Sequence, residues 1–215
     1  MLKLAAKFIV AAIAATFCGV ATAADVSDVV ATARSYSDGG GYEWKGTGVP
    51  EEIRFGQHKI LGKGKATYCS GFTFAVVMKA AAARGLFADK TYDEVRRFQK
   101  AWYGSTEESA ETQCVFALEK LKIGRAVKVD DAQAGDFLQL WRTNKSGHSV
   151  VFLEWVNEGG RRVGLKYRST QKSTDGIGDR VEYFASETEK KGAVDPKRLY
   201  FGRLDETRKR GRGSH

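Results

Sequence analysis

The stretch YCSGFTFAVVMKAAAARG, residues 68–85, decides the fold of this chain. Apolar residues fall on every side of the helix that it would form, and only Lys79 and Arg84 are charged, so we expect this helix to be buried at the centre of a domain. Cys69 stands where the helix begins, and the free backbone N–H groups and the helix dipole at that end stabilise a thiolate relative to a thiol. We therefore predict that Cys69 is a reactive cysteine.

The composition of the chain is typical of one globular domain, with 215 residues of which 42% are hydrophobic and 28% are charged. A helical pattern also covers residues 26–36. Five runs rich in Val, Phe, Tyr, Trp and Leu follow in the second half and read as strands: 136–143, 149–157, 162–170, 180–186 and 198–204. Helices followed by strands predict a single α+β domain over residues 24–204, with an antiparallel sheet packed on the Cys69 helix. Residues 205–215 form a basic tail that we expect to be disordered.

Two capping boxes predict the helices that come after the Cys69 helix. Residues 91–94 (TYDE) and residues 105–108 (STEE) each place a hydroxyl three residues before a glutamate, ahead of apolar positions at helical spacing. The second helix carries Cys114 on its apolar face. We interpret Cys114 as a buried core thiol.

The N-terminus has the pattern of a secretory signal peptide over Met1–Ala23. Lys3 and Lys7 precede an apolar run over residues 8–20, and small residues at 21–23 supply a cleavage site. The run is too short to span a bilayer, so we expect soluble export to the periplasm or the exterior, without a membrane span. The net charge of +9 stays strongly positive after the two lysines are removed, which favours an anionic cell-envelope polymer as a partner. Because the chain is exported, nucleic acid is not an expected partner.

Export leaves two interpretations of the remaining cysteines open. In an oxidising compartment Cys69 and Cys114 are candidates for a disulfide, which would staple two helices of a non-enzymatic binding module. Alternatively, Cys69 is a free nucleophile. The residues alone do not decide between these two interpretations.

A long glycine-rich segment, residues 42–65, leads to Cys69. Long loops often carry function, so we expect this segment to form one wall of a cleft. Its polar and aromatic candidates for substrate contact are Tyr42, Trp44, Gln57 and His58, although each of these is more often a structural or surface residue.

A cysteine nucleophile needs a general base, and the chain has three histidines: His58, His148 and His215. His148 stands at the head of a predicted strand, where the imidazole can be held rigidly, so we predict that it is the base. A hairpin turn centred within residues 157–161 places His148 opposite about residue 170.

The alternation of that second strand also selects a residue to orient the imidazole. Its apolar face ends in Ser169 and Gln171, whereas Lys166, Arg168 and Thr170 fall on the face expected to be wet. We predict Gln171 as the orienting residue and Ser169 as the second choice.

Three motifs in order resemble the papain-like NlpC and CHAP groups of bacterial cell-wall peptidases and amidases. They are Cys-Ser-Gly-Phe at 69–72, Gly-Asp at 135–136 before a strand, and Gly-His at 147–148 leading the next strand. The resemblance covers residues 67–171. It departs from the family at Tyr68, where Asp or Asn is frequent, in the wider separation of the cysteine from the histidine, and at the third position, which is more often His, Asn or Asp.

The resemblance implies a papain-like fold in which Cys69 is the nucleophile, His148 the base and Gln171 the orienting residue, with Asp136 structural. It implies an exported cysteine peptidase or amidase acting on peptidoglycan or another amide, without a metal or cofactor. The backbone N–H of Cys69 and a donor such as Tyr42 or Gln57 would hold the oxyanion. An acyltransferase of the same fold is the remaining alternative.

Overall fold

The computed structural model describes residues 27–207, so the predicted signal peptide and residues 208–215 of the basic tail lie outside the described part. Four α-helices occur within it: α1 (Asp28–Arg34), α2 (Cys69–Ala83), α3 (Tyr92–Trp102) and α4 (Cys114–Leu121). The strands are β1 (Gly39–Gly40), β2 (Ile53–Phe55), β3 (His58–Leu61), β4 (Gly124–Val127), β5 (Phe137–Arg142), β6 (Gly147–Glu158), β7 (Arg161–Gln171), β8 (Gly176–Tyr183) and β9 (Val194–Leu204). No helix among residues 27–207 is long and apolar enough to cross a membrane.

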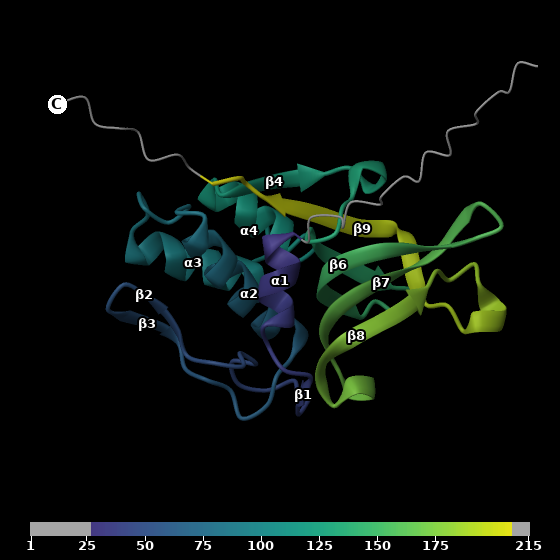
Figure 1. The fold of residues 1–215 in the computed structure, drawn as a ribbon, viewed down its shortest axis with the longest axis horizontal. Helices are drawn as coiled ribbons and strands as arrows, with labels where there is room; N and C mark the ends of the chain where they lie inside the picture. The colour runs from purple at the N-terminus through teal and green to yellow at the C-terminus, as the bar shows by residue number, and fades with distance from the viewer. Residues whose placement is uncertain (1–26, 208–215) are drawn as a thin grey trace, which may run out of the picture.

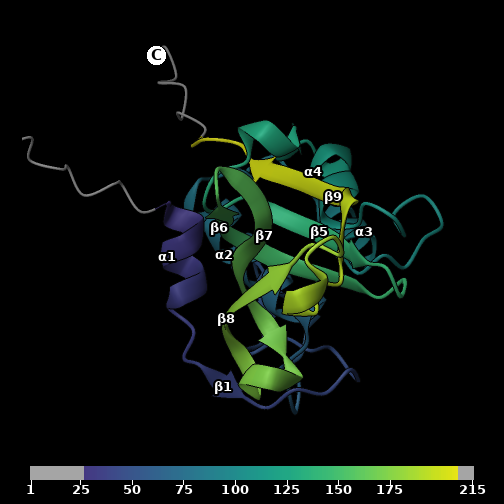
Figure 2. The ribbon, with the colours of Figure 1, turned by 90° about the vertical axis from the view of Figure 1, so that its right-hand side faces the viewer.

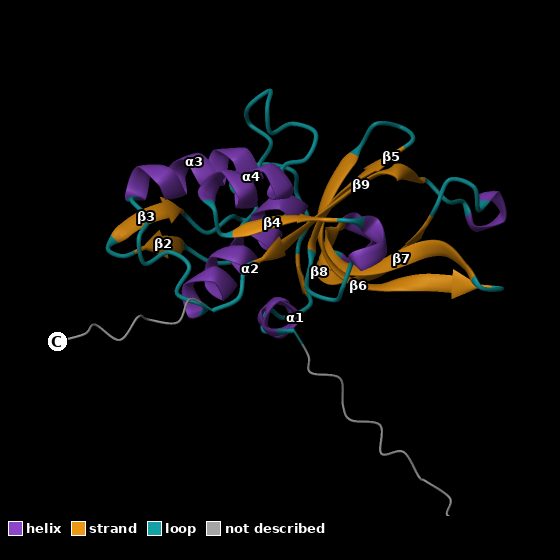
Figure 3. Ribbon diagram, turned by 90° about the horizontal axis from the view of Figure 1, so that it is seen from above, coloured by secondary structure: helices purple, strands orange, loops and turns teal. Residues whose placement is uncertain are grey.

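Seven of these strands form one antiparallel sheet in the order β1-β8-β7-β6-β5-β9-β4, and β2 and β3 form a separate hairpin. The helices gather on one side of the molecule and the curved sheet on the other (Figure 1 and Figure 3). Seen from the sheet side, β6, β7 and β8 curve together beside α1 (Figure 2). The predicted α+β class with an antiparallel sheet is confirmed. The short strands β1 to β4 were not predicted, and β8 and β9 begin several residues earlier than their patterns indicate.

The helix α2 is central, as predicted, because 11 of its 15 residues are buried. It contacts α1 and α3 among the helices and β6 and β7 in the sheet. At its first turn the Thr73 hydroxyl donates to the Cys69 carbonyl (3.0 Å) and accepts from the Trp102 indole N–H (3.1 Å). The helix start is therefore fixed both by its own side chain and by α3.

Both faces of the central strands are buried, which overturns one prediction. On the helix side Phe137 and Val151 join the helical core, and on the opposite face Leu138, Val150 and Tyr167 form a second core inside the curve of the sheet. The sheet therefore has no wet face at its centre.

Arg168 and Thr170 were predicted on a wet face, and this is wrong, because they are 3% and 0% exposed. The guanidinium of Arg168 lies beneath α1, where it donates to the carbonyls of Ala33 and Tyr36 and pairs with Asp38 (2.6 Å). A buried arginine is tolerated here because its donors are satisfied.

The first predicted capping box is confirmed and the second is wrong. The Thr91 hydroxyl accepts from the Glu94 N–H, and the Glu94 carboxylate accepts from the Thr91 N–H (2.7 Å). In the second box, Thr106 instead bonds to Ser109 in a local turn (hydroxyl oxygens 2.8 Å apart), so α4 begins only at Cys114. Short-range hydroxyl bonding of this kind competes with helix formation.

Asp136 ties the start of β5 to β9. Its carboxylate is buried and accepts two hydrogen bonds from Arg203, from Nε (2.6 Å) and Nη2 (2.8 Å), and a third from the Gln133 N–H (2.8 Å). Asp136 thus has the structural position that the resemblance implies.

Replacing Asp136 by Asn tests this contact. The free energy of unfolding is expected to fall by about 3 kcal/mol, because the change removes the charge that compensates Arg203 in a buried pair. Urea denaturation measures the loss. The matched control is Asp205→Asn, whose ion pair with Arg125 is exposed and contributes less than about 1 kcal/mol. Equal losses in the two variants would contradict the structural role of Asp136.

Candidate functional site

A cleft of about 630 Å³ opens between the first turn of α2 and the adjoining ends of β5 to β8. Cys69, His148 and Gln171, predicted from three separate stretches of sequence, all line this cleft. Tyr42 and Trp44 from the glycine-rich segment line it from another side. The sequence-predicted nucleophile, base and orienting residue therefore lie together.

Cys69 is the first residue of α2 and is partly exposed, with Sγ 3.9 Å from the Ser70 hydroxyl oxygen. Cys114 is buried at the start of α4, and burial raises the pKa of its thiol to about 12. Both cysteines are free thiols in this structure. The disulfide that the binding-module interpretation requires is therefore not formed here.

His148 is the second residue of β6 and is only 5% exposed. Its ring packs edge-on against Tyr167, with the ring centroids 5.4 Å apart. Burial, and then the positive charge of Arg142, lower the pKa of His148 to about 3, although Glu182 and Gln171 oppose this shift. The imidazole is therefore neutral near pH 7.

Gln171 lies across from His148 because of the register of β6 and β7. Val151 pairs with Arg168, and the same register continued by three residues sets His148 opposite Gln171. The contact of the two side chains agrees with this, since the Gln171 side chain acts on the pKa of His148. The position predicted opposite His148 was residue 170, one residue away. The difference arises because Glu158 pairs with Arg161 around a two-residue Gly-Gly turn, whose centre lies half a residue beyond the assumed one.

The side-chain amide of Gln171 is held in one orientation. Its Nε2 donates to the Thr174 hydroxyl (2.6 Å) and, more weakly, to the Gly178 carbonyl (3.5 Å). Its Oε1 and the Nε2 of His148 are both buried atoms without a hydrogen-bond partner among the described residues. The Gln171 side chain also raises the pKa of His148, against the larger effect of burial. We interpret Oε1 of Gln171 as the acceptor of a hydrogen bond from a protonated Nε2 of His148. The unprotonated nitrogen, Nδ1, is then the one available to the cleft.

The sequence analysis missed a charged cluster that lies beside His148. Arg142 donates two hydrogen bonds to Glu182 (2.6 and 2.7 Å), and the Tyr167 hydroxyl donates a third (2.5 Å). Burial disfavours the carboxylate of Glu182, but the bonds from Arg142 and Tyr167 outweigh burial and lower its pKa to about 2. No pattern in the sequence links these three residues, because they come from three different strands.

The glycine-rich wall rests directly on the first turn of α2. A Cβ at Gly71 would lie 2.2 Å from the carbonyl carbon of Gly48, so only glycine fits two residues after Cys69. Tyr103 also holds the wall, since its hydroxyl donates to the Thr47 carbonyl (2.7 Å). The pKa of the Tyr42 hydroxyl is raised, first by burial and then by the negative charge of a Cys69 thiolate. The second effect places Tyr42 within electrostatic range of Cys69. The expected wall is therefore present at Tyr42 and Trp44.

The glycine of the Gly-His motif also has a packing reason. A Cβ at Gly147 would lie 2.7 Å from the Gln139 side-chain nitrogen and 3.1 Å from the ring of Trp141. These two side chains come from β5, the neighbour of β6 in the sheet. The motif glycines thus let other elements approach Cys69 and His148 closely.

The structure does not bring three other candidates into the cleft. Gln57 and His58 are exposed on the hairpin of β2 and β3, where the ring of His58 packs against Tyr92 (centroids 5.1 Å apart). Ser169 is fully buried and donates to the Ser149 carbonyl (2.7 Å). Gln57 lies on a hairpin outside the cleft, and the Ser169 hydroxyl is already bonded to the neighbouring strand. Neither residue is therefore placed to hold an oxyanion or a substrate.

Two glutamines line the cleft that the sequence analysis did not select. The Ser149 hydroxyl donates to Oε1 of Gln139 (2.6 Å) and lies 3.4 Å from Oε1 of Gln113. Gln113 has a φ of 39°, which is uncommon for a residue with a side chain. The Nε2 of Gln113 donates weakly to the Ala110 carbonyl (3.4 Å), so the strained backbone holds a side chain that bridges its own loop and β6.

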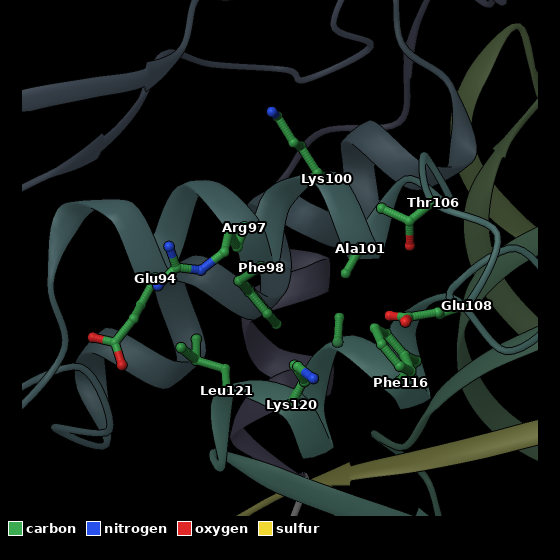
Figure 4. Close-up of a pocket in the computed structure, with 11 residues that line it drawn as sticks. Glu94, Arg97, Phe98, Lys100, Ala101, Thr106, Glu108, Phe116, Lys120 and Leu121 are labelled. Atoms are coloured by element: carbon green, nitrogen blue, oxygen red, sulfur yellow. The ribbon is translucent and has the colours of Figure 1, made fainter.

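A second cavity, of about 310 Å³, lies between α3 and α4, where Phe98, Phe116 and Leu121 point inward (Figure 4). It contains no cysteine or histidine and shares no residue with the Cys69 cleft. The second cavity therefore offers neither of the residue types that the candidate site combines.

Comparison of the chain with profiles of known protein families, with curated proteins and with solved structures finds no match. Within residues 27–207, no group of three or more His, Cys, Asp or Glu side chains is arranged to hold a metal ion. A functional assignment therefore depends on the geometry of the cleft.

The burial of His148 predicts a loss of stability in acid. The pKa of His148 is about 3 in the folded protein and about 6.5 in an unfolded chain. As the pH falls below about 6.5, the unfolded state binds a proton that the folded state does not bind, so the free energy of unfolding falls by up to about 1.4 kcal/mol per pH unit.

Urea denaturation of the wild type and of His148→Gln at pH 7, 6 and 5 checks this expectation. This range stays above the pH at which Glu182, whose pKa is about 2, takes up a proton in the folded protein. The stability of the wild type relative to the variant should decline as the pH falls. Parallel curves for the two proteins would contradict the prediction.

Proposed function

We propose that this protein is a cysteine hydrolase that cleaves amide bonds. One observation carries the proposal: the helix start, β6 and the end of β7 bring Cys69, His148 and Gln171 to one cleft. A cysteine at a helix N-terminus, an imidazole and an amide that orients the imidazole are the parts that a thiolate mechanism needs. The Cys-Ser-Gly-Phe, Gly-Asp and Gly-His motifs support a papain-like arrangement of these parts.

The first half of the reaction forms an acyl-enzyme. The Cys69 thiol gives its proton to Nδ1 of His148, and the thiolate sulfur attacks the amide carbonyl carbon. The backbone N–H of Cys69 and the hydroxyl of Tyr42, which lines the same cleft, hold the negative charge that develops on the carbonyl oxygen. As the C–N bond breaks, the imidazolium gives the proton to the leaving nitrogen, and the free amine departs.

The second half releases the acyl group. His148 removes a proton from water, the hydroxide oxygen attacks the thioester carbon, and the proton returns to sulfur as the carboxylic acid leaves. Burial and Arg142 disfavour the imidazolium form of His148. The protonated ring is therefore a strong acid, which favours proton transfer to the leaving group. The neutral ring is a weak base toward the Cys69 thiol, so the negative charge that forms on the sulfur must raise the pKa of His148 during the first step.

Peptidoglycan is the substrate that the proposal names. The predicted signal peptide favours export to the periplasm or the exterior, and the net charge of +9 favours binding to an anionic cell envelope. Tyr42 and Trp44 on the glycine-rich wall offer aromatic surface to a sugar or peptide, and Trp44 is 81% exposed. An acyltransferase would use the same residues and differ in passing the acyl group to an amine instead of water.

Digestion of purified peptidoglycan tests the proposal, with the released fragments measured by mass spectrometry. Replacing Cys69 or His148 by Ala should lower the rate at least about 1,000-fold, because each removes a part that the others cannot replace. Fragments that carry a new carboxylate identify hydrolysis, and fragments joined to an added amine identify transfer.

Cys114→Ala is the matched control for Cys69→Ala, since it removes the other thiol at a buried position away from the cleft. Its specific activity should stay close to that of the wild type in the folded fraction. Gln171→Ala should retain intermediate activity, about 10- to 100-fold below the wild type, since it affects only the orientation of the base. Wild-type rates from Cys69→Ala would rule the mechanism out.

A further inference from the structure

We propose that the mouth of the Cys69 cleft holds a subsite for a carboxylate, so that the protein selects amides with a negative charge close to the bond that is cleaved. This inference rests on the proposed function and specifies its substrate. It is carried by Lys145, Lys172 and Arg180, which all line the cleft.

The three cations reach the cleft from three different elements. Lys145 lies in the turn between β5 and β6, three residues before His148. Lys172 directly follows Gln171 at the end of β7, and Arg180 lies on β8, where it pairs with Tyr167 of β7. The same strand ends that position the catalytic residues therefore also gather positive charge.

The protein neutralises only part of this charge. The residues that line the cleft include four cations, with Arg142 as the fourth, and no carboxylate. Glu182 lies beside them but already binds both Arg142 and Tyr167, and Arg180 reaches the same carboxylate at 3.6 Å.

Two guanidinium groups thus share one carboxylate, and one positive charge remains. Lys145 and Lys172 are exposed and form no ion pair with any described residue. The positive charge that remains at the mouth therefore comes from two ammonium groups and one guanidinium. These groups offer a carboxylate an opposite charge and hydrogen-bond donors.

The cleft also offers uncharged surface. Tyr42, Trp44 and Trp141 line it with aromatic rings. A bound substrate can therefore pair its carboxylate with the lysines and pack its uncharged part on the aromatic rings. This combination favours a carboxylate on the substrate itself over general attraction to a charged polymer.

Two alkylating reagents measure this field at the sulfur. Iodoacetate and iodoacetamide both transfer a CH₂ group to the Cys69 sulfur with loss of iodide, and only iodoacetate carries a carboxylate. The quantity to measure is the rate with iodoacetate divided by the rate with iodoacetamide. We expect this ratio to be about tenfold higher for Cys69 than for N-acetylcysteine amide at low ionic strength, and to fall as salt is added. In Lys145→Gln/Lys172→Gln the ratio should fall about threefold to tenfold.

The matched control is Lys100→Gln/Lys120→Gln, which removes two charges beside the cavity between α3 and α4. Its ratio should equal that of the wild type, because charges outside the cleft are screened. Equal ratios in the two double variants, or a wild-type ratio that does not change with salt, would overturn the subsite. Each ratio is taken within one protein, so a change in the reactivity of the thiol cancels.

A second readout needs no reactive thiol. In Cys69→Ala protein, glutarate should shift the backbone amide resonances of Gly147 and Lys172, whereas glutaramide should not. Larger shifts with inorganic phosphate than with glutarate would overturn the assignment to a carboxylate. If the protein does not digest peptidoglycan but shows both the alkylation effect and the glutarate shifts, the proposed function is wrong and the subsite stands. If it digests peptidoglycan but shows neither effect, the subsite is wrong and the proposed function stands.

Discussion

Because α2 is enclosed by other helices and the sheet, its first turn has little freedom to move, and this constraint determines where Cys69 lies. The Thr73 hydroxyl links the Cys69 carbonyl to the indole of Trp102, so the helix start is tied to α3. The glycine-rich wall is pressed against the same turn at Gly71. Under the proposed mechanism, a nucleophile that is held in this way does not need to be ordered when a substrate binds, which lowers the cost of reaching the transition state.

The sheet supplies the other half of the site through strand register. The tight turn after Glu158 sets the pairing of β6 with β7, and this pairing brings the Gln171 amide to the buried edge of His148. The cluster of Arg142, Glu182 and Tyr167 then fixes the electrostatic environment of the ring. The alignment of strand ends at a single edge therefore positions the proposed base, its proposed orienting group and the two lysines of the mouth.

The parts of the site that could be predicted from sequence are those with a local signal. Cys69 heads an apolar helix and His148 follows a glycine at a strand start, so both could be selected, and Gln171 followed from alternation despite a register error of one residue. Arg142 and Glu182 meet only through the order of strands in the sheet, which no local pattern encodes.

The wrong predictions have the same physical origin. The burial of Arg168 depends on α1 covering β7, a contact that forms only in the folded chain. The helix expected to begin after residue 105 begins only at Cys114, because Thr106 and Ser109 bond to each other in a local turn. In both cases a specific side-chain contact outweighed the general pattern.

The most direct test of the account is thiol mapping of the protein purified without reductant, by iodoacetamide labelling and peptide mass spectrometry. The account predicts that Cys69 is labelled in the native protein, whereas Cys114, with a pKa raised to about 12 by burial, is labelled only after denaturation. Two unlabelled cysteines recovered in one disulfide-linked peptide pair would contradict the account, because Cys69 would then be a structural residue.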